Sequence, residues 1–119
     1  LMTAAARPVV EDIYAETEIT AAEAVLTVLE AADESMIGRR FAFGDSISIG
    51  RGDANDIVIN DGYVSHRHAR VELLNNLYVI EDLGSVNKTY VNGQEIAGRQ
   101  YLQSGDIISI GTVTFQFGR

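Results

Sequence analysis

The sequence predicts an all-β protein, built as a sandwich or a barrel, and three observations support this. Most of the chain after residue 39 alternates apolar and polar residues with period two, as in SISIG (46–50) and TVTFQFG (112–118). Turn-forming Gly, Asn and Asp residues separate these runs at short intervals. No helical pattern lies between one run and the next. Short strands spaced in this way are typical of β-sandwiches and barrels.

The expected strands follow one another between turn signals. AVLTVLE (24–30) is ambiguous, because its composition tolerates a helix while Val25, Thr27 and Val28 favour a strand. The turn signals are GD at 44, NN at 75, NG at 92, SGD at 104 and G at 111. They separate runs at 40–43, 46–50, 56–60, 68–74, 77–83, 89–93, 106–111 and 112–118.

The first 23 residues differ from the rest of the chain. They are rich in Ala, Thr and Glu, their apolar residues are scattered and mostly small, and they carry a net charge of -4. We therefore expect residues 1–23 to be a flexible acidic tail or linker, and residues 24–119 to form one domain.

Composition excludes several functions. The 119 residues include no Cys, so there is no disulfide, thiolate metal site or Cys nucleophile, and a cytoplasmic location is favoured. The net charge of -8 argues against nucleic acid as a partner. No run approaches the ~20 apolar residues that span a bilayer, so no membrane partner is expected.

The stretch YVSHRHARVEL (63–73) concentrates the polar residues that could carry chemistry, including the chain's two histidines. His66 and His68 would lie on one face of a strand, but zinc usually takes four ligands, and no other His or Cys exists to complete the set. Arg67 and Arg70 would also repel a cation. We therefore expect no metal and no cofactor.

Catalysis and plain structure are the next alternatives. Ser65 and His68 could belong to a triad only if geometry joined them, and Ser65 lies on no GxSxG elbow. We predict no catalytic residue. A structural His68 that ties down a loop by hydrogen bonding is a plausible alternative, but it leaves the grouping of Ser65, Arg51 and Asn87 unexplained. A loop that binds an anion would explain it.

Further motifs favour the anion-binding loop. SISIGRGDANDIVI (46–59), the SxxH of residues 65–68, DLGSVNKTYVNG (82–93) and LQSGDIISIG (102–111) occur in this order. Together they resemble the forkhead-associated (FHA) domain family, over about residues 24–119. The resemblance implies an SMAD/FHA-like β-sandwich of about 11 strands in two antiparallel or mixed sheets. It also implies phosphothreonine-peptide binding by loops at one end, and no enzymatic activity. AVLTVLE then matches the family's first strand.

The resemblance assigns roles to individual residues. Arg51, after Gly50, matches the arginine that contacts the phosphate, and its guanidinium is a planar fork that suits phosphate oxygens. Ser65 matches the serine whose hydroxyl donates to the phosphate, and His68 matches the structural histidine. Asn87 matches the asparagine that holds the backbone of the ligand peptide, for which an amide offers both a donor and an acceptor.

Other positions are expected to be structural or to set specificity. Gly50, Gly93, Gly105 and Asp106 match structural positions of the family in turns. Tyr63 lies two residues before Ser65, in a loop that in the family reads residues beyond the phosphothreonine, so we expect it to help select the peptide.

Three positions depart from the family pattern. His66 stands where Arg, Lys or Asn is usual, and because imidazole gains charge near neutral pH, we expect affinity to rise as pH falls from about 7.5 to about 6.5. Val86 stands where many members have Thr, and cannot donate a hydrogen bond to phosphate. Lys88 replaces a Gly, which would be strained if the backbone φ is positive.

Two partners follow from this interpretation. The first is a phosphothreonine protein in a Ser/Thr kinase pathway, with phosphate-independent interaction or self-association as the alternative function. The second is the tail, because some bacterial members of the family carry a phosphorylatable threonine that folds back onto their own FHA domain. Thr17 and Thr20 are the candidate phosphorylation sites here, for binding to the same molecule or to a neighbouring one, and a plain interdomain linker is the alternative.

Overall fold

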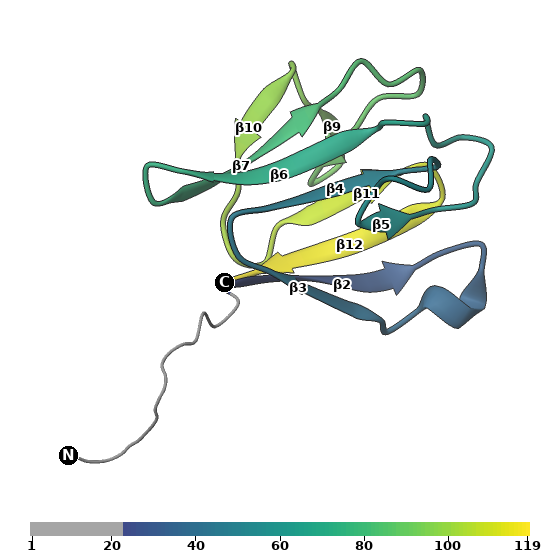
Figure 1. The fold of residues 1–119 in the computed structure, drawn as a ribbon, viewed down its shortest axis with the longest axis horizontal. Coiled ribbons are helices and arrows are strands. Elements are labelled where there is room, and N and C mark those ends of the chain that lie inside the picture. The colour runs from purple at the N-terminus through teal and green to yellow at the C-terminus, as the bar shows by residue number, and fades with distance from the viewer. Residues whose placement is uncertain (1–22) are drawn as a thin grey trace, which may run out of the picture.

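The computed structural model describes residues 23–119, which form a β-sandwich of two sheets (Figure 1). The tail residues 1–22, with Thr17 and Thr20, lie outside the described residues. One sheet has the order β10-β7-β6-β4-β5, and the other has the order β3-β2-β12-β11-β8-β9. The strands of the first sheet are β4 (Ser46–Gly50), β5 (Ile57–Val58), β6 (Ala69–Leu74), β7 (Leu77–Asp82) and β10 (Arg99–Tyr101). Those of the second are β2 (Ala24–Glu30), β3 (Arg40–Phe43), β8 (Tyr90–Val91), β9 (Gln94–Glu95), β11 (Ile107–Ile110) and β12 (Val113–Gly118).

The predicted fold class is confirmed, and residues 24–30 form the strand β2. Two strands and one short helix were not predicted. β9 and β10 have two and three residues, all of them exposed, so they carry no apolar alternation. The 3-10 helix η1 (Glu34–Met36) is one turn long, and the Asp33 side chain caps it by accepting a hydrogen bond from the backbone N–H of Ser35.

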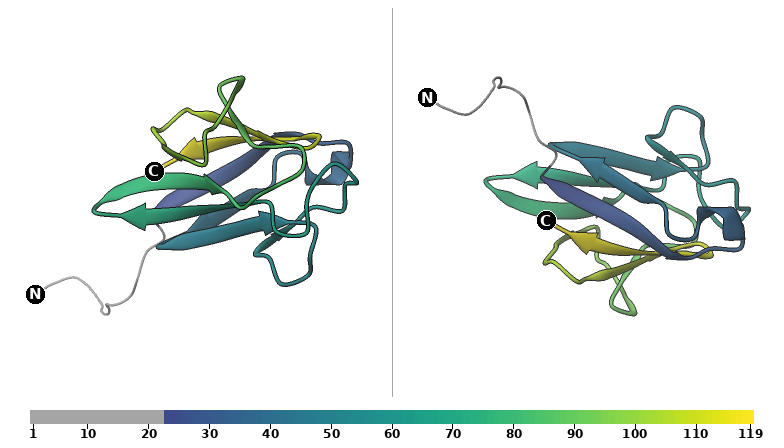
Figure 2. Two further views of the ribbon diagram at one scale, coloured as in Figure 1. Left: turned by 90° about the horizontal axis from the view of Figure 1, so that it is seen from above. Right: turned by 90° about the horizontal axis from the view of Figure 1, so that it is seen from below.

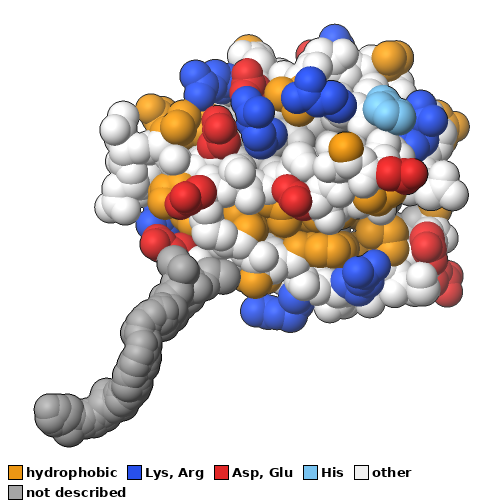
Figure 3. All heavy atoms as spheres, viewed as in Figure 1, with side chains coloured by type: hydrophobic (Ala, Val, Ile, Leu, Met, Phe, Trp, Pro, Cys, Tyr) orange, Lys and Arg blue, Asp and Glu red, His pale blue; other side chains and the backbone are white. Residues whose placement is uncertain are grey.

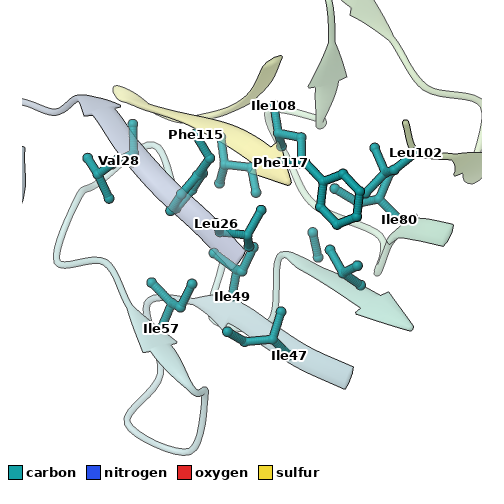
Figure 4. Packing of buried hydrophobic residues seen from close by; sticks show 14 of the residues in the cluster. Leu26, Val28, Ile47, Ile49, Ile57, Ile80, Leu102, Ile108, Phe115 and Phe117 are labelled. Atoms are coloured by element: carbon teal, nitrogen blue, oxygen red, sulfur yellow. The ribbon is translucent and has the colours of Figure 1, made fainter. Parts of the chain in front are cut away.

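Alternation along the strands builds the core between the two sheets. Leu26 of β2 and Phe117 of β12 are buried against Ile49 of β4 and Ile80 of β7, which come from the opposite sheet (Figure 4). Burying one such side chain contributes about 1.5–3 kcal/mol. The core therefore fixes the two sheets relative to each other, and with them the loops at their ends.

The turns have the geometry that their sequences predict. Asn75 and Asn76 have φ of 51° and 67°, and Asn92 and Gly93 have φ of 52° and 83°. Two consecutive positive φ values are typical of the tight hairpin turns that favour Asn and Gly. Asp106 accepts hydrogen bonds from Asn92 Nδ2 at 3.0 Å and from the Gln103 N–H at 2.8 Å.

Strand directions bring three loops to one end of the sandwich. β4 and β5 are parallel, β6 is antiparallel to β4, and β7 is antiparallel to β6. The β4–β5, β5–β6 and β7–β8 loops therefore lie together at the right of Figure 1, while residue 23 and the C-terminus lie at the left (Figures 1 and 2). Among residues 23–119, no helix combines the length and apolar character that a membrane crossing requires.

Candidate functional site

His68 joins two of the three loops. Its side chain is fully buried, and its Nδ1 accepts a hydrogen bond from the backbone N–H of Ser65 at 3.0 Å. Its Nε2 lies 2.8 Å from the carbonyl oxygen of Lys88. Because Nδ1 accepts, the ring proton must be on Nε2, which donates to Lys88. A neutral imidazole thus links the β5–β6 loop to the β7–β8 loop.

Ser65 is held by both neighbouring loops. Its Oγ accepts a hydrogen bond from the backbone N–H of Val86 at 3.0 Å, and its carbonyl accepts one from the N–H of Arg51 at 2.9 Å. A hydroxyl has one proton to donate besides its lone pairs. Because a lone pair of Oγ accepts the hydrogen bond from Val86, the hydroxyl proton of Ser65 is free to donate to a ligand.

The guanidinium of Arg51 is anchored beside Ser65. Its Nε donates to the carbonyl of Val64 at 3.0 Å, and the residue is exposed. The remaining four N–H groups of the guanidinium belong to its two terminal nitrogens. A fork oriented in this way, next to a free hydroxyl proton, suits a phosphate group.

Two glycines allow the β4–β5 and β5–β6 loops to pack closely. A Cβ on Gly50 would overlap the carbonyl oxygen of His66 and lie 2.7 Å from Asn55 Nδ2. A Cβ on Gly52 would lie 2.6 Å from Nε2 of His66, so the imidazole rests on this glycine. Asn55 Nδ2 donates to the carbonyls of Gly52 and His66, both at 2.8 Å. The sequence analysis missed Asn55, although its place in the turn GDAND is a typical one for a side chain that bonds to nearby backbone.

The other predicted ligand residues surround this centre. Asn87 is exposed, and its Nδ2 donates to the carbonyl of Tyr63 at 3.0 Å, which leaves its Oδ1 for a ligand. The side chains of Tyr63 and Val86 are 64% and 81% exposed. Lys88 has φ of 70°, which is the strained conformation expected if Lys stands where Gly is usual.

The side chain of Asp82 holds the β7–β8 loop by hydrogen bonds, a role that the sequence analysis did not predict. Its Oδ2 accepts from Ser85 Oγ at 2.6 Å and from Thr89 Oγ1 at 2.7 Å, and its Oδ1 accepts from the N–H groups of Gly84 and Ser85. Burial raises the pKa of Asp82, but these four hydrogen bonds outweigh it and leave the pKa below its ordinary value. An Asp followed by Gly and Ser two and three residues later is the available signal for such a loop.

Asp61 ties the β5–β6 loop to the β11–β12 turn. Its Oδ2 accepts from the N–H of Thr112 at 2.9 Å and from Thr112 Oγ1 at 2.6 Å, and its Oδ1 accepts from the N–H of Tyr63. A Cβ on Gly111 would lie 2.6 Å from Val64 Cγ2, so the turn needs a glycine there. The segment before Ser65 is therefore fixed at both ends.

The structure also locates the other two arginines of the stretch 63–73 and allows the metal and catalytic-triad alternatives to be examined. Arg70 pairs with Glu81 at 3.1 Å and Glu72 at 3.7 Å on the outer sheet face, away from the loops, while Arg67 is exposed. Figure 3 shows a His side chain among Lys and Arg side chains at the loop end of the molecule.

Between residues 23 and 119, no three His, Asp or Glu side chains gather as metal ligands. Ser65 Oγ meets a backbone N–H rather than an imidazole, so the triad alternative has no geometric support.

This sandwich, with an Arg, a Ser and an Asn brought together by braced loops, is an FHA domain. The FHA domain family model matches residues 47–111, and the chain belongs to this family.

Three relatives illustrate the comparison. The glycogen accumulation regulator GarA of Mycobacterium tuberculosis is 41% identical over 81 residues, which cover 67% of this chain and 49% of GarA. The oxoglutarate dehydrogenase inhibitor of Corynebacterium glutamicum is 37% identical over 81 residues, covering 67% of this chain and 56% of the inhibitor. The solved structure of M. tuberculosis EmbR with a low-affinity phosphopeptide matches with a TM-score of 0.69 and 33% identity, covering 79% of this chain and 24% of EmbR. The chain spans about half the length of the curated relatives it matches.

Proposed function

We propose that this FHA domain is a signalling module that binds phosphothreonine peptides and thereby recruits phosphorylated protein partners. One observation carries the proposal: Arg51 and Ser65, from different loops, are hydrogen-bonded side by side with donors left over. A phosphate ester carries about -1.5 to -2 charges at pH 7 and three acceptor oxygens. The guanidinium supplies charge and a planar fork, and the Ser65 hydroxyl supplies a further donor.

The residues around this pair would hold the peptide. Asn87 binds the backbone of the ligand, Tyr63 and Val86 contact side chains beside the phosphothreonine, and Lys88 and His66 add positive charge near the phosphate. His68, with Gly50, acts only by holding the loops in place. Gly93, Gly105 and Asp106 stabilise turns away from the ligand.

The proposed setting is a cytoplasmic Ser/Thr kinase pathway, with regulation rather than catalysis as the outcome. The names of GarA and of the oxoglutarate dehydrogenase inhibitor describe a regulator and an inhibitor. The separate kinase would phosphorylate the partner, and this domain would then bind it.

A second candidate is phosphate-independent interaction, which Val86 and Lys88 favour. Val86 adds no hydroxyl to the site, and its side chain is 81% exposed, as an apolar protein contact would require. In this alternative, matched peptides with Thr and with phosphothreonine bind equally well.

The tail of residues 1–23 is a further proposed partner, through phosphorylated Thr17 or Thr20. Glu23 is hydrogen-bonded to Phe43, at the opposite end of the sandwich from Arg51. From Gly44 to Arg51 the chain advances seven residues along β4, which is about 23 Å. Thr20 can reach at most about 11 Å from Glu23 and Thr17 at most about 22 Å. The reach of Thr17 nearly equals this span before the side chains of phosphothreonine and Arg51 are added, so we propose that a phosphorylated tail binds the site of its own molecule or that of a neighbouring one.

An oriented phosphothreonine peptide library tests the main proposal. The best peptide is then compared with its unphosphorylated and phosphoserine forms by calorimetry. We expect binding of the phosphothreonine form at least tenfold tighter than that of the Thr form. Equal affinities would replace the main proposal with the phosphate-independent one.

A further inference from the structure

A cavity of about 330 Å³ lies next to the candidate site, on the open side of the sandwich. Its walls come from the β2–β3 loop with η1, from β5 and the β5–β6 loop, and from the β11–β12 turn. Figure 3 shows hydrophobic side chains along this side of the molecule, between the edge strands β5 and β3 of Figure 1. A cavity of this size is at the small end of the range for ligand sites, so it suits one large side chain better than a whole cofactor.

The cavity presents an apolar surface to solvent. Met36, Val58 and Val113 line it, together with Ala31 and Tyr63. Val58 is 42% exposed on the edge strand β5. An apolar side chain that enters the cavity would remove this surface from water, which favours binding.

The two carboxylates of the lining already have partners within the protein. Asp61 accepts hydrogen bonds from the N–H and the hydroxyl of Thr112 and from the N–H of Tyr63. Asp33 accepts hydrogen bonds from the N–H and the hydroxyl of Ser35. A ligand group that donates to these carboxylates would compete with the existing bonds, whereas an apolar group leaves them in place.

The charge of the lining works against an acidic ligand. Asp33, Asp61 and Arg39 are its charged residues, so it carries a net charge of -1. The guanidinium of Arg39 lies over the ring of Phe41, 4.9 Å from its centroid. We therefore expect Asp and Glu to be the least favoured side chains in the cavity.

Tyr63 joins the cavity to the candidate phosphate site. It lines the cavity, and its carbonyl accepts a hydrogen bond from Asn87, the residue proposed to hold the backbone of the ligand. Asp61 on the cavity wall and Ser65 at the phosphate site are four residues apart, which is at most about 14 Å. Because an extended peptide advances about 3.3 Å per residue, one with its phosphate at Ser65 reaches the cavity in about three to five residues.

We propose that the phosphothreonine partner places a large apolar side chain, such as Leu, Met or Phe, in this cavity. We call the cavity the apolar subsite, after its residues Ala31, Met36, Val58, Tyr63 and Val113. The apolar side chain lies about three to five residues from the phosphothreonine. The proposal rests on the proposed function, because the phosphate site must first position the peptide. Phosphorylated proteins that lack an apolar residue at this separation bind only through the phosphate and the backbone.

Calorimetry with a phosphothreonine peptide in an alanine background tests the subsite. Leu replaces Ala in turn at each position from three to five residues before and after the phosphothreonine. We expect Leu at one position, or at two adjacent ones, to raise the affinity at least about fivefold, and Glu at the same position to bind no better than Ala. If all these peptides bind equally well, the subsite is overturned and the phosphate site stands. If no phosphopeptide binds, both proposals fall.

Matched variants of the full chain locate the contact. Val58→Gln makes the wall of the subsite polar, and Ala32→Phe fills the cavity from an exposed position on its rim. Each should reduce the gain from Leu to less than about twofold. Ile37→Gln is the control and should keep the full gain, because Ile37 is 48% exposed in the same β2–β3 loop but does not line the cavity.

The alanine-background peptide checks that these variants fold. It should bind Val58→Gln, Ala32→Phe and Ile37→Gln as tightly as it binds the wild type, because it places no large side chain in the subsite. A gain from Leu that survives in both cavity variants would overturn the proposal.

Met36 gives a direct signal from the subsite in the wild-type protein. It is one of two methionines in the chain and is buried in the cavity wall. In protein labelled at the methionine methyl groups, the Met36 resonance is assigned by comparison with Met36→Leu. At equal saturation, the best Leu peptide should shift this resonance clearly more than the alanine-background peptide does. Equal shifts with the two peptides would contradict insertion of the apolar side chain.

Discussion

At the scale of single residues, His68 shows how a polar side chain can be conspicuous in the sequence and yet serve the structure. It is buried, and its two ring nitrogens bond to the backbone of Ser65 and Lys88. His66, two positions earlier, is exposed and rests on Gly52. The same residue type therefore supports two different expectations, one for stability and one for binding.

Replacing His68 should destabilise the domain. His68→Ala leaves a backbone donor and a backbone acceptor without partners, and each unsatisfied buried group costs about 1–3 kcal/mol. We expect a loss of about 2–4 kcal/mol in the free energy of unfolding, measured by urea denaturation. His66→Ala should change it by less than about 0.5 kcal/mol. Equal losses in the two variants would show that the buried bonds of His68 contribute little.

Replacing Lys88 should stabilise the domain while weakening binding. A positive φ costs a residue with a side chain about 1–2 kcal/mol, and glycine does not pay this cost. Glycine instead loses about 0.5–1 kcal/mol on folding, because its unfolded chain has more conformational entropy. Lys88→Gly should therefore gain about 0.5–1 kcal/mol in the free energy of unfolding, and lose phosphopeptide affinity with the ammonium group. Arg67→Gly is the control, because Arg67 is not among the described residues with positive φ. A destabilised Lys88→Gly would mean that the side chain makes compensating contacts.

His66 should make binding depend on pH. Protonated imidazole adds a positive charge beside the phosphate, so phosphopeptide affinity should rise as pH falls from about 7.5 to about 6.5. Below about pH 6 the phosphate itself gains a proton and opposes the effect. Calorimetry of wild type and His66→Asn across this range measures the difference, and parallel pH profiles would remove His66 from the site.

At the scale of elements, the loops of the candidate site are held by side chains other than the proposed ligand residues. Asp82 holds the β7–β8 loop, Asp61 joins the β5–β6 loop to a turn of the other sheet, and Asn55 joins the first two loops. Each of these three side chains makes at least two hydrogen bonds: Asp61 and Asp82 accept them, and Asn55 donates them. Such braces let the loops hold a fixed geometry before a ligand arrives, which reduces the entropy cost of binding.

Asp82 should make stability fall in acid. Its pKa is lower in the folded protein than its ordinary value of about 3.9, so its contribution is present above that value and is lost as pH falls through the folded pKa. Asp82→Asn should lose about 1–3 kcal/mol in the free energy of unfolding at pH 7. It should also lose less stability than the wild type between about pH 5 and pH 3. Asp53→Asn, at an exposed position, is the control, and an acid profile of Asp82→Asn equal to that of the wild type would refute the assignment.

At the scale of the whole molecule, the alternation of apolar residues and the turn signals predicted the fold, while long-range contacts decided the rest. Strands with a buried face, such as β4 and β12, carry their pattern in the sequence. β10 does not, because it forms by pairing with β7 and has no buried side chain. The same holds for the site. Its candidate ligand residues were predicted from ordered motifs, whereas Asp61 and its partner Thr112 are 51 residues apart and no local pattern joins them.

The central claim is that residues from separate loops converge on one phosphate, and calorimetry with a phosphothreonine peptide tests it most directly. Arg51→Ala and Ser65→Ala should each lose about 1.5–3 kcal/mol of binding free energy, or roughly 10- to 150-fold in affinity, with thermal stability little changed. Arg67→Ala, which removes a cation from the same region, should change affinity less than about twofold. Equal losses for Arg51→Ala and Arg67→Ala, or no loss for Arg51→Ala, would contradict a phosphate site built on Arg51 and Ser65.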